Sequence, residues 1–288
     1  TGVPSNTIYN LAKKMSLHRT MITGAWALQR QQYGEQPHWM ITVLACMLGQ
    51  IGLPGGGFGL GYSAENGIGN PVQYFKWPSL EQFKNPVSEF IPVARISDML
   101  LQPGKVFSYN GKEIKYPDIK LVYWAGGNPF HHQMNLKKLV RAFKQPDTII
   151  VNEIWWNSLA RHSDIILPAT TSLERNDISI KHWDQTISPM YKVIEPIGES
   201  KSDYEIFSEI SSKLSFKDKF TEGKDEDKWL RFIWDEAISK AKEEGFTLPE
   251  FDKFWKNGFQ EVLSPKKQTI LLEQFRIDPE KSPISTPS

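Results

Sequence analysis

Short apolar runs alternate with amphipathic segments in the middle of the chain. The runs Ile119–Trp124, Thr148–Val151 and Ile165–Leu167 have the length and composition of buried strands. Met134–Phe143 has helical apolar spacing and separates the first two runs, and Trp156–His162 is helix-like and separates the last two. Strands that alternate with helices over so short a stretch predict a parallel sheet covered on both faces.

Helical patterns dominate the two ends of the chain. Helices are expected over Ser5–Ser16 and Pro37–Gln50, with a short strand, Thr20–Trp26, between them. Towards the C-terminus, a strand is expected first and three helices follow, at Tyr191–Ile194, Tyr204–Leu214, Trp229–Glu244 and Phe251–Trp255. The predicted fold class is α/β: an open, mostly parallel sheet with helices on both faces, a partial second α/β unit and a helical C-terminal segment.

Glycine and proline mark the connections between these elements. Leu53–Gly69 contains seven glycines, a density that neither a helix nor a strand tolerates well, so this stretch is predicted to be loop. Asn110-Gly111 lies between two short alternating runs within Phe107–Tyr116, which predicts a tight hairpin. A short helix is expected at Ala94–Leu101.

Composition narrows the class of protein. The 34 Lys and Arg residues balance 33 Asp and Glu residues, so net charge gives no reason to expect nucleic acid as a partner. The longest apolar run, Met40–Leu48, is too short to span a bilayer. One cysteine, Cys46, excludes a disulfide or a four-thiolate iron-sulfur site within the chain. Because the sequence begins at Thr1 without Met, we expect a piece of a longer protein.

Small polar residues follow each of the three central strands. Gly126-Gly127-Asn128 comes after the first strand, Asn152-Glu153 after the second and Thr170 after the third, with Arg175 soon behind. Ligands of open parallel sheets bind beyond the carboxyl ends of the strands, where glycine amides and arginine suit phosphates. Each segment alone is also compatible with a simple turn or helix cap, but the three together favour a binding site.

The obvious dinucleotide motifs are absent. Gly126-Gly127-Asn128-Pro129 lacks the G-x-G-x-x-G spacing of nicotinamide-dependent enzymes. Gly55–Gly59 contains a G-x-G, but it follows a predicted helix rather than a strand, and neither segment ends in G-K-[ST].

Several other residues invite chemical roles and have plainer interpretations. His131 and His132 are adjacent, but no second ligand cluster supports a metal site, so ligand contact or capping is favoured. Cys46 lies in an apolar helical pattern and is expected in the core. Asp164 is interpreted as part of a helix-to-strand turn. A stripe with helical spacing is also expected in the core: Trp229, Phe232, Ile233 and Ala237.

Four segments, read together, resemble one family. They are Trp26–Trp39, Leu48–Gly59, Gly126–His132 and Asp164–Asp177. In number and order they resemble the molybdopterin oxidoreductases of the dimethyl sulfoxide reductase family, most closely the branch that reduces trimethylamine N-oxide and biotin sulfoxide.

The resemblance implies a catalytic subunit that holds one molybdenum between two molybdopterin guanine dinucleotides. Such an enzyme removes an oxygen atom from an S-oxide or N-oxide, such as biotin sulfoxide, trimethylamine N-oxide or dimethyl sulfoxide. It implies an electron donor such as a c-type cytochrome or a thiol/flavin system, no nucleic acid, no membrane span, and a periplasmic or cytoplasmic location in a bacterium.

The resemblance also implies roles for particular residues. Trp26 and Arg30 resemble the residues near the dithiolene end and the substrate funnel. Glu153 or Asp203 is expected to accept paired hydrogen bonds from guanine. The full set expected at the cofactor is Gly126, Gly127, Asn128, His131, His132, Asn152, Glu153, Arg175, Asn176 and Asp203.

Departures from the family pattern indicate a central fragment. The serine that binds molybdenum in this branch belongs to an amino-terminal segment that nothing in this chain matches, so no protein ligand to the metal is expected here. We expect residues 1–52 to end one dinucleotide-binding domain, 53–215 to form most of a second, and 216–288 to form a helical connecting segment. The isolated chain is expected to be inactive.

Three alternatives remain open from the sequence. The first is that the chain is part of another molybdopterin oxidoreductase. The second is that it is part of a nucleotide-dependent enzyme whose phosphate motif is not recognisable. The third is that it is a scaffold domain without catalysis.

Overall fold

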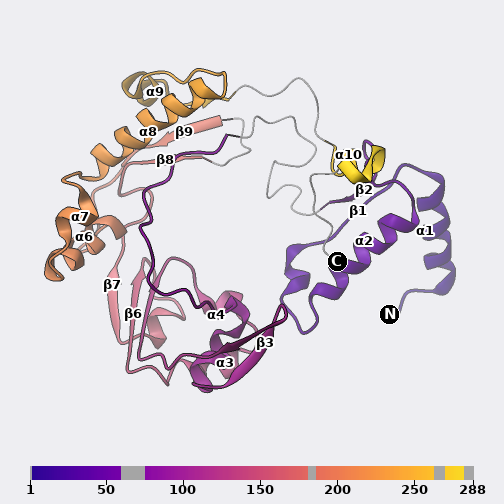
Figure 1. Cartoon of the computed structure of the whole chain (residues 1–288), viewed down its shortest axis with the longest axis horizontal. Helices are drawn as coiled ribbons and strands as arrows, with labels where there is room; N and C mark the ends of the chain where they lie inside the picture. The colour runs from indigo at the N-terminus through magenta and orange to yellow at the C-terminus, as the bar shows by residue number, and fades with distance from the viewer. Residues whose placement is uncertain (1, 60–74, 181–185, 263–269, 282–288) are drawn as a thin grey trace. The chain divides into compact units, whose positions relative to one another are not determined.

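The computed structural model describes residues 2–59, 75–180, 186–262 and 270–281 (Figure 1). The chain divides into two compact units. The first contains residues 1–76, 181–186 and 261–288, and the second contains residues 77–180 and 187–260. These bounds differ from the expected ones at 52 and 215, and the assignment of dinucleotide-binding domains stays a prediction.

Two helices and a small parallel sheet form the first unit. The predicted helices are present as α1 and α2, and the predicted strand at Thr20–Trp26 is shorter and gives way to a 3-10 turn at Trp26. The elements are α1 (Ser5–Leu17), β1 (Met21–Thr23), η1 (Trp26–Gln29), α2 (Glu35–Met47), β2 (Gly57–Gly59), α10 (Glu273–Ile277) and η4 (Pro279–Lys281).

The strand β2 corrects the prediction that all of Leu53–Gly69 is loop. It pairs in parallel with β1, so that Met21 lies opposite Gly57. A Cβ atom on Gly57 would lie 3.2 Å from the Ile51 Cα, so glycine allows the strand to pass close to the end of α2. The part of the predicted loop from residue 60 onward lies outside the described residues.

An arginine from the far end of the chain completes the first unit. The Nη1 atom of Arg276, in α10, donates to the carbonyl oxygens of Gly49 and Ile51, each at 2.9 Å. Gly52 makes this approach possible, because a Cβ atom there would lie 2.7 Å from the Arg276 Cβ.

The prediction that Cys46 lies in the core is wrong, because its side chain is exposed. Ala45 is the one residue of α2 that is buried in the described structure. Much of the apolar surface of α2, including Met40 and Met47, is therefore exposed in the described structure.

A three-stranded parallel sheet forms the centre of the second unit, in the order β5-β6-β7. This confirms the predicted strands and their separation by helices, although Trp156–His162 forms no more than a 3-10 turn. The elements are β5 (Leu121–Ala125), α4 (Pro129–His132), α5 (Leu136–Ala142), β6 (Thr148–Glu153), η3 (Ala160–His162) and β7 (Ile165–Pro168).

Both faces of this sheet carry helices, as predicted. On one face, Ile149 and Val151 pack in a core with Leu139 of α5 and Leu100 of α3 (Ile96–Leu101). On the other face, the Tyr123 ring lies 5.4 Å from that of Phe207 in α6 (Asp203–Lys213). The two-residue periodicity of the strands separates these two sets of side chains.

A hairpin and a short helix precede this sheet, and one turn within it was also predicted. The hairpin of β3 (Val106–Tyr109) and β4 (Lys112–Lys115) is confirmed, with Asn110 and Gly111 at φ values of 49° and 71°. The turn η2 (Val93–Arg95) leads into α3, which confirms the expected short helix. Asp164 is confirmed in its turn, where its Oδ2 accepts from the Ile149 amide at 2.8 Å.

A second sheet contains β8 (Asp177–Ser179), β9 (Thr186–Met190) and β10 (Gln260–Glu261), in the order β10-β9-β8, and β8 and β9 are antiparallel. The predicted strand at Tyr191–Ile194 is wrong. Its backbone amides are used elsewhere, because the Lys192 amide donates to Asn176 and those of Val193 and Ile194 to the Leu173 carbonyl.

Four helices complete the second unit: α6, α7 (Lys217–Thr221), α8 (Glu226–Glu243) and α9 (Phe251–Asn257). The predicted core stripe on α8 is only partly right, because Phe232 is 42% exposed. The buried face is centred on Trp234, whose ring stacks on Phe254 at 3.7 Å and whose Nε1 donates to the Pro249 carbonyl. Among the described residues, no helix is both long and apolar enough to cross a membrane.

Candidate functional site

The carboxyl ends of β5, β6 and β7 lie side by side, as the sequence predicts. The register places Ala125 opposite Asn152, and Asn152 opposite Leu167. The polar segments that follow the three strands therefore lie along one edge of the sheet.

The turn after β5 leaves room at the backbone and an unpartnered amide. Gly126 and Gly127 have φ values of 76° and 78°, and nothing lies within 4 Å of a Cβ built on either. Asn128 is 8% exposed, and its Oδ1 accepts from the Phe130 amide at 3.0 Å. Its buried Nδ2 has no hydrogen-bond partner in the described structure. A donor left in this state is ready to bind a polar ligand.

A chain of side-chain hydrogen bonds joins the end of β6 to α6. The Tyr123 hydroxyl donates to Asn152 Oδ1 at 2.8 Å, and Asn152 Nδ2 donates to Asp203 Oδ1 at 2.7 Å. Burial raises the pKa of Tyr123, which keeps the phenol protonated as a donor. Asp203 is the first residue of α6, whose capping box is formed by Ser202 and Glu205.

The Glu153 carboxylate accepts hydrogen bonds from the loop that follows it. Its Oε1 accepts from the amides of Ile154 and Trp155 at 2.9 and 3.3 Å. Its Oε2 accepts from Asn157 Nδ2 at 2.6 Å. Most of the acceptor capacity of this carboxylate is thus used inside the protein.

The turn after β7 is held by a buried glutamate. Glu174 is 5% exposed and accepts from the Thr171 amide and the Ile197 amide, each at 2.7 Å. The Thr171 amide, followed by that of Ile197, lowers the pKa of Glu174, so the side chain is a carboxylate. The hydroxyl oxygen of Thr170 is buried and has no partner in the described residues.

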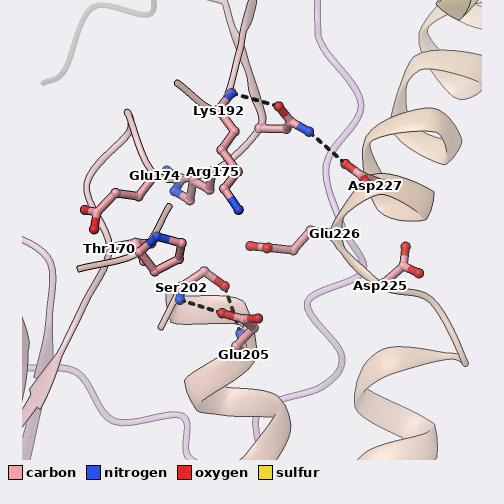
Figure 2. Close-up of a pocket in the computed structure, with 11 residues that line it drawn as sticks. Thr170, Glu174, Arg175, Lys192, Ser202, Glu205, Asp225, Glu226 and Asp227 are labelled. Atoms are coloured by element: carbon pink, nitrogen blue, oxygen red, sulfur yellow. Dashed lines mark hydrogen bonds between the residues drawn. The ribbon is translucent and has the colours of Figure 1, made fainter. Parts of the chain in front are cut away.

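A polar pocket of about 370 Å³ opens beside this turn (Figure 2). Arg175 lines it and forms an ion pair with Asp177. Asn176 also lines it, with its Oδ1 accepting from the Lys192 amide at 2.9 Å and its Nδ2 donating to Asp227 at 3.2 Å. The opposite wall is the start of α8, from which Glu226 points into the pocket (Figure 2).

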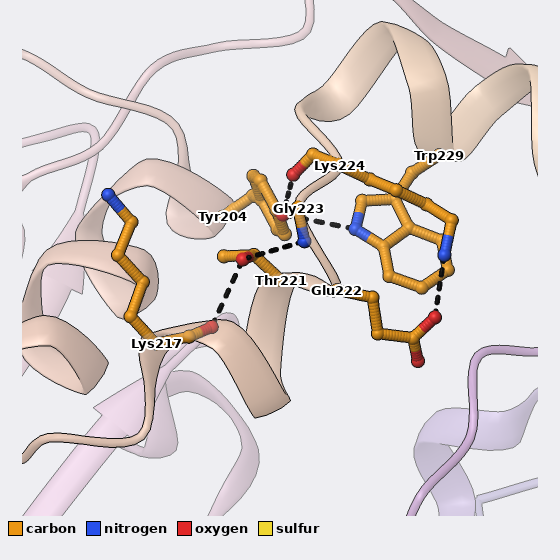
Figure 3. Close-up of polar contacts among 7 residues, drawn as sticks. All are labelled: Tyr204, Lys217, Thr221, Glu222, Gly223, Lys224 and Trp229. Carbon is orange, nitrogen blue, oxygen red and sulfur yellow. Dashed lines mark hydrogen bonds and ion pairs between the residues drawn. The ribbon is translucent and has the colours of Figure 1, made fainter.

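Hydrogen bonds hold the start of α8 against α6 (Figure 3). The Tyr204 hydroxyl donates to the Lys224 carbonyl at 2.5 Å and accepts from Trp229 Nε1 at 3.0 Å. The Lys224 ammonium lies 4.2 Å from the centre of the Trp229 ring and forms an ion pair with Glu222 at 2.6 Å. This network fixes the loop from which the acidic wall of the pocket begins.

The other predicted site residues are His131, His132, Trp26 and Arg30, and none of them lines the pocket beside β7. His131 and His132 are exposed at the end of α4, next to the turn after β5. Trp26, which is 43% exposed, and Arg30, also exposed, belong to the first unit, at η1 and its end. Their roles stay a prediction, as do those of the cofactor set.

The residues that the structure describes contain no group of three or more His, Cys, Asp or Glu side chains able to hold a metal ion. The candidate site is instead a row of hydrogen-bonding groups along the sheet edge, with carboxylates beside β6 and the cations Arg175 and Lys192 beside β7. Such a row suits a long polar ligand with both hydrogen-bonding rings and phosphates.

The sequence interpretation missed three residues here. Tyr123 faces away from Val122 and Trp124, and strand alternation could have shown this. Lys192 and Glu226 lie far along the chain from the strand ends, in segments with no motif, and nothing in the sequence signals that they line one pocket.

The profile of a family described as molybdopterin oxidoreductase matches residues 7–213. The chain is similar over its whole length to biotin sulfoxide reductase of Cereibacter sphaeroides, with 44% identity, and covers 39% of that protein. It is 45% identical to trimethylamine-N-oxide reductase of Haemophilus influenzae and 43% identical to dimethyl sulfoxide/trimethylamine N-oxide reductase of Rhodobacter capsulatus. In both cases the match covers 100% of this chain and 37% of the relative. The chain therefore spans less than two fifths of the length of these proteins.

Proposed function

The chain belongs to the molybdopterin oxidoreductase family, and from this premise we propose that it is part of a reductase of S-oxides or N-oxides. The relatives named for biotin sulfoxide, trimethylamine N-oxide and dimethyl sulfoxide support this substrate class. The overall reaction takes two electrons and two protons, breaks the S–O or N–O bond, and releases the reduced product and water.

We further propose that the cofactor is the guanine dinucleotide form of molybdopterin, in a pair around one molybdenum. The observation that carries this proposal is the row of polar groups along the carboxyl edge of the sheet. The buried Asn128 Nδ2 and Thr170 Oγ1, which have no hydrogen-bond partner among the described residues, fit a ligand that supplies hydrogen bonds at each end of that row. When bound, the metal centre supplies the electron exchange of the reaction.

In this proposal, the residues of this chain bind the cofactor and orient it. Gly126 and Gly127 leave space for a phosphate near their backbone amides, and Asn128 and Asn152 offer neutral hydrogen bonds. Arg175 offers a guanidinium to a phosphate. We propose that Trp26 and Arg30 contact the substrate side of the cofactor. The electron donor we propose is a c-type cytochrome or a thiol/flavin system, in the bacterial periplasm or cytoplasm.

Analysis of the full-length protein tests this function. We expect molybdenum in the purified protein, release of GMP on acid hydrolysis, and oxidation of reduced viologen when one of the three oxides is added. Protein from a host unable to make molybdopterin is the control and should lack all three properties. An active preparation without molybdenum contradicts the function, and molybdenum with pterin but without GMP contradicts the dinucleotide form.

A further inference from the structure

The strand that leads to Trp26 lies in a sheet too small to fix its own register. The strand β1 has three residues, and it pairs with β2, which consists of two glycines around one phenylalanine. Isolated two-stranded sheets are marginally stable, and glycine-rich strands specify their register weakly. A slip of one residue would move Trp26 by about 3.3 Å and turn the β1 side chains to the opposite face. Contacts outside the sheet are therefore needed to hold β1 in place.

The side chain of Gln50 supplies such a contact at the amino end of β1. Its Oε1 accepts from the Thr20 amide and its Nε2 donates to the His18 carbonyl, both at 2.8 Å. A carboxamide suits this position, because it carries an acceptor and a donor on one planar group. The half-buried Gln50 side chain thus binds both an N–H and a C=O group of the backbone that enters β1.

The backbone at Gln50 also contacts the amino end of β2. A Cβ atom on Gly56 would lie 2.8 Å from the Gln50 carbonyl oxygen, and one on Gly57 would lie 3.2 Å from the Ile51 Cα. These two glycines allow β2 to begin directly against the turn that carries Gln50. One turn therefore touches the starts of both strands, and its position determines how β1 and β2 align.

Arg276 holds this turn in place from α10, which lies beside it (Figure 1). The two hydrogen bonds of Arg276 reach the carbonyls on either side of Gln50, those of Gly49 and Ile51. The backbone from which the Gln50 side chain extends is thereby held at two points. Both bonds come from the single nitrogen Nη1, so an ammonium group, with three donors on one nitrogen, can make them as well.

The carboxyl end of β1 connects closely to Trp26. Gly24 and Ala25 alone separate the last residue of β1 from Trp26. A Cβ atom on Gly24 would lie 2.6 Å from the Ile41 Cδ1, so the chain runs directly against α2 there. The Ala25 carbonyl accepts from the Leu28 amide at 3.2 Å in the first turn of η1. A displacement of β1 therefore reaches Trp26 through two residues that are themselves packed or hydrogen-bonded.

We propose that Gln50 and Arg276 are positioning residues for the substrate side of the site. Gln50 sets the register of β1 and thereby the place of Trp26, and Arg276 acts through Gln50. This inference rests on the proposed function and deepens it, because it makes binding of the oxide depend on the end of α2 and on α10.

Substitution of Gln50 in the full-length, molybdenum-loaded enzyme tests the proposal. Gln50→Met keeps the length of the side chain and removes both hydrogen bonds. It is expected to raise the KM for the best oxide about tenfold and to change kcat per molybdenum less than about twofold, because a misplaced contact residue weakens substrate binding. A purely structural role would instead lower the loaded fraction of the protein and leave KM unchanged. Gln274→Met, at an exposed position of α10, is the matched control and should keep the wild-type values.

Two substitutions of Arg276 test the second residue. Arg276→Met removes both donors and is expected to raise KM about fivefold, because Gln50 then loses its support. Arg276→Lys should stay within about twofold of the wild-type KM, since its ammonium can donate to both carbonyls. If Gln50→Met does not fold, a wild-type KM in Arg276→Met overturns the inference.

A double-mutant cycle with Trp26→Ala separates positioning from a general weakening of the enzyme. Once the indole is gone, its place no longer affects binding of the oxide. Gln50→Met is therefore expected to raise KM less than about twofold further in the Trp26→Ala background. Equal increases of KM in the two backgrounds overturn the inference.

Hydrogen exchange measures the same coupling without catalysis. In full-length protein freed of its cofactor, Gln50→Met should speed the exchange of the amides of residues 22–28 about fivefold or more, and exchange in β5 to β7 should not change. Unchanged exchange over residues 22–28 overturns the inference.

Failure of the proposed function gives a different result. Wild-type protein that holds no molybdenum, or that reduces none of the three oxides, refutes both the function and the inference. Active wild-type enzyme, together with variants of Gln50 and Arg276 that keep its KM, refutes only the roles of these two residues.

Discussion

Two buried polar atoms of the second unit lack a hydrogen-bond partner among the described residues, Asn128 Nδ2 and Thr170 Oγ1. An unsatisfied buried group costs free energy in the protein that carries it. Both follow strands of the same sheet, at the edge where a ligand is expected. Their cost to the free protein is what a bound cofactor would relieve.

Removal of the Thr170 hydroxyl is expected to affect cofactor affinity and the unfolding free energy differently. Thr170→Val is expected to leave the unfolding free energy of cofactor-free full-length protein unchanged or to raise it by up to about 1 kcal/mol, because the hydroxyl oxygen has no hydrogen-bond partner among the described residues. Cofactor affinity should fall about tenfold. Urea unfolding and cofactor content after dialysis measure the two effects. A stability loss above about 1 kcal/mol would show that the hydroxyl has a protein partner.

The ion pair between Asp98 of α3 and Lys138 of α5 makes a pH-dependent contribution to the free energy of unfolding. Burial acts to raise the pKa of Asp98, but Lys138 and Arg95 outweigh it and lower the pKa. The unfolded carboxyl, with a pKa of about 3.9, therefore binds protons more readily than the folded one. The stabilisation is present above about pH 4 and is lost as the pH falls below that value.

Asp98→Asn should therefore lower the unfolding free energy by about 1 kcal/mol at pH 7 and by progressively less as the solution is acidified below about pH 4. Denaturant unfolding across this range measures the difference. Asp118→Asn is the control, because its pair with Lys120 is more exposed, and a smaller effect is expected there. An Asp98→Asn effect that does not change with pH would contradict the pairing.

The position of site residues could be predicted, whereas their partners could not. Asn152 and Glu153 were located because they follow an apolar run in a predicted parallel sheet. That Glu153 binds its own loop depends on Asn157, four residues later in an irregular segment without a recognisable pattern. Likewise, Glu226 reaches the pocket because tertiary contacts of Tyr204 and Trp229 fix the start of its helix.

At the scale of elements, α5 presents one clearly buried face to the sheet. Leu139 is 0% exposed in the core, whereas Leu136, on the same helix, is 46% exposed. Leu139→Ala is expected to lower the unfolding free energy by about 2–5 kcal/mol, because a cavity forms in a packed core. Leu136→Ala should cost less than about 1 kcal/mol. Similar losses in the two variants, measured by denaturant unfolding, would contradict the packing of α5.

Elements built from local patterns were predicted, and those built from distant pairing were not. The strands β5, β6 and β7 are apolar runs, and the hairpin has its Asn110-Gly111 turn. In contrast, β8 pairs with β9 through contacts such as Ile178 with Pro189, and proline gives no strand signal. The strand β2 consists of glycines around one phenylalanine and depends on close approach to Ile51, in the turn after α2.

At the scale of the molecule, large aromatic side chains are exposed at several places in the chain. Trp39, Trp155 and Trp156 are 64%, 68% and 67% exposed. Relatives are more than twice as long as this chain, and exposed apolar surface of this kind marks contact sites.

The 288-residue chain produced alone is therefore expected to bind the dye ANS and to self-associate, whereas the full-length protein should do neither at equal concentration. Dye fluorescence and sedimentation measure these properties. A monomeric chain that does not increase the fluorescence of ANS would contradict exposure of these surfaces.

The hydrogen bonds of Arg276 have a consequence for synthesis. They join residues 227 and 225 positions apart, whereas the strands β5 to β7 lie within residues 121–168. At about 5–20 residues per second, a ribosome needs about 10–50 s to deliver Arg276 after Gly49 and Ile51 have been made. The central sheet has all its strands within a few seconds of its first residue, because its contacts are close in sequence. The nascent chain thus completes the central sheet before the first unit, and the carbonyl groups of Gly49 and Ile51 lack the hydrogen bonds of Arg276 until that residue has been made.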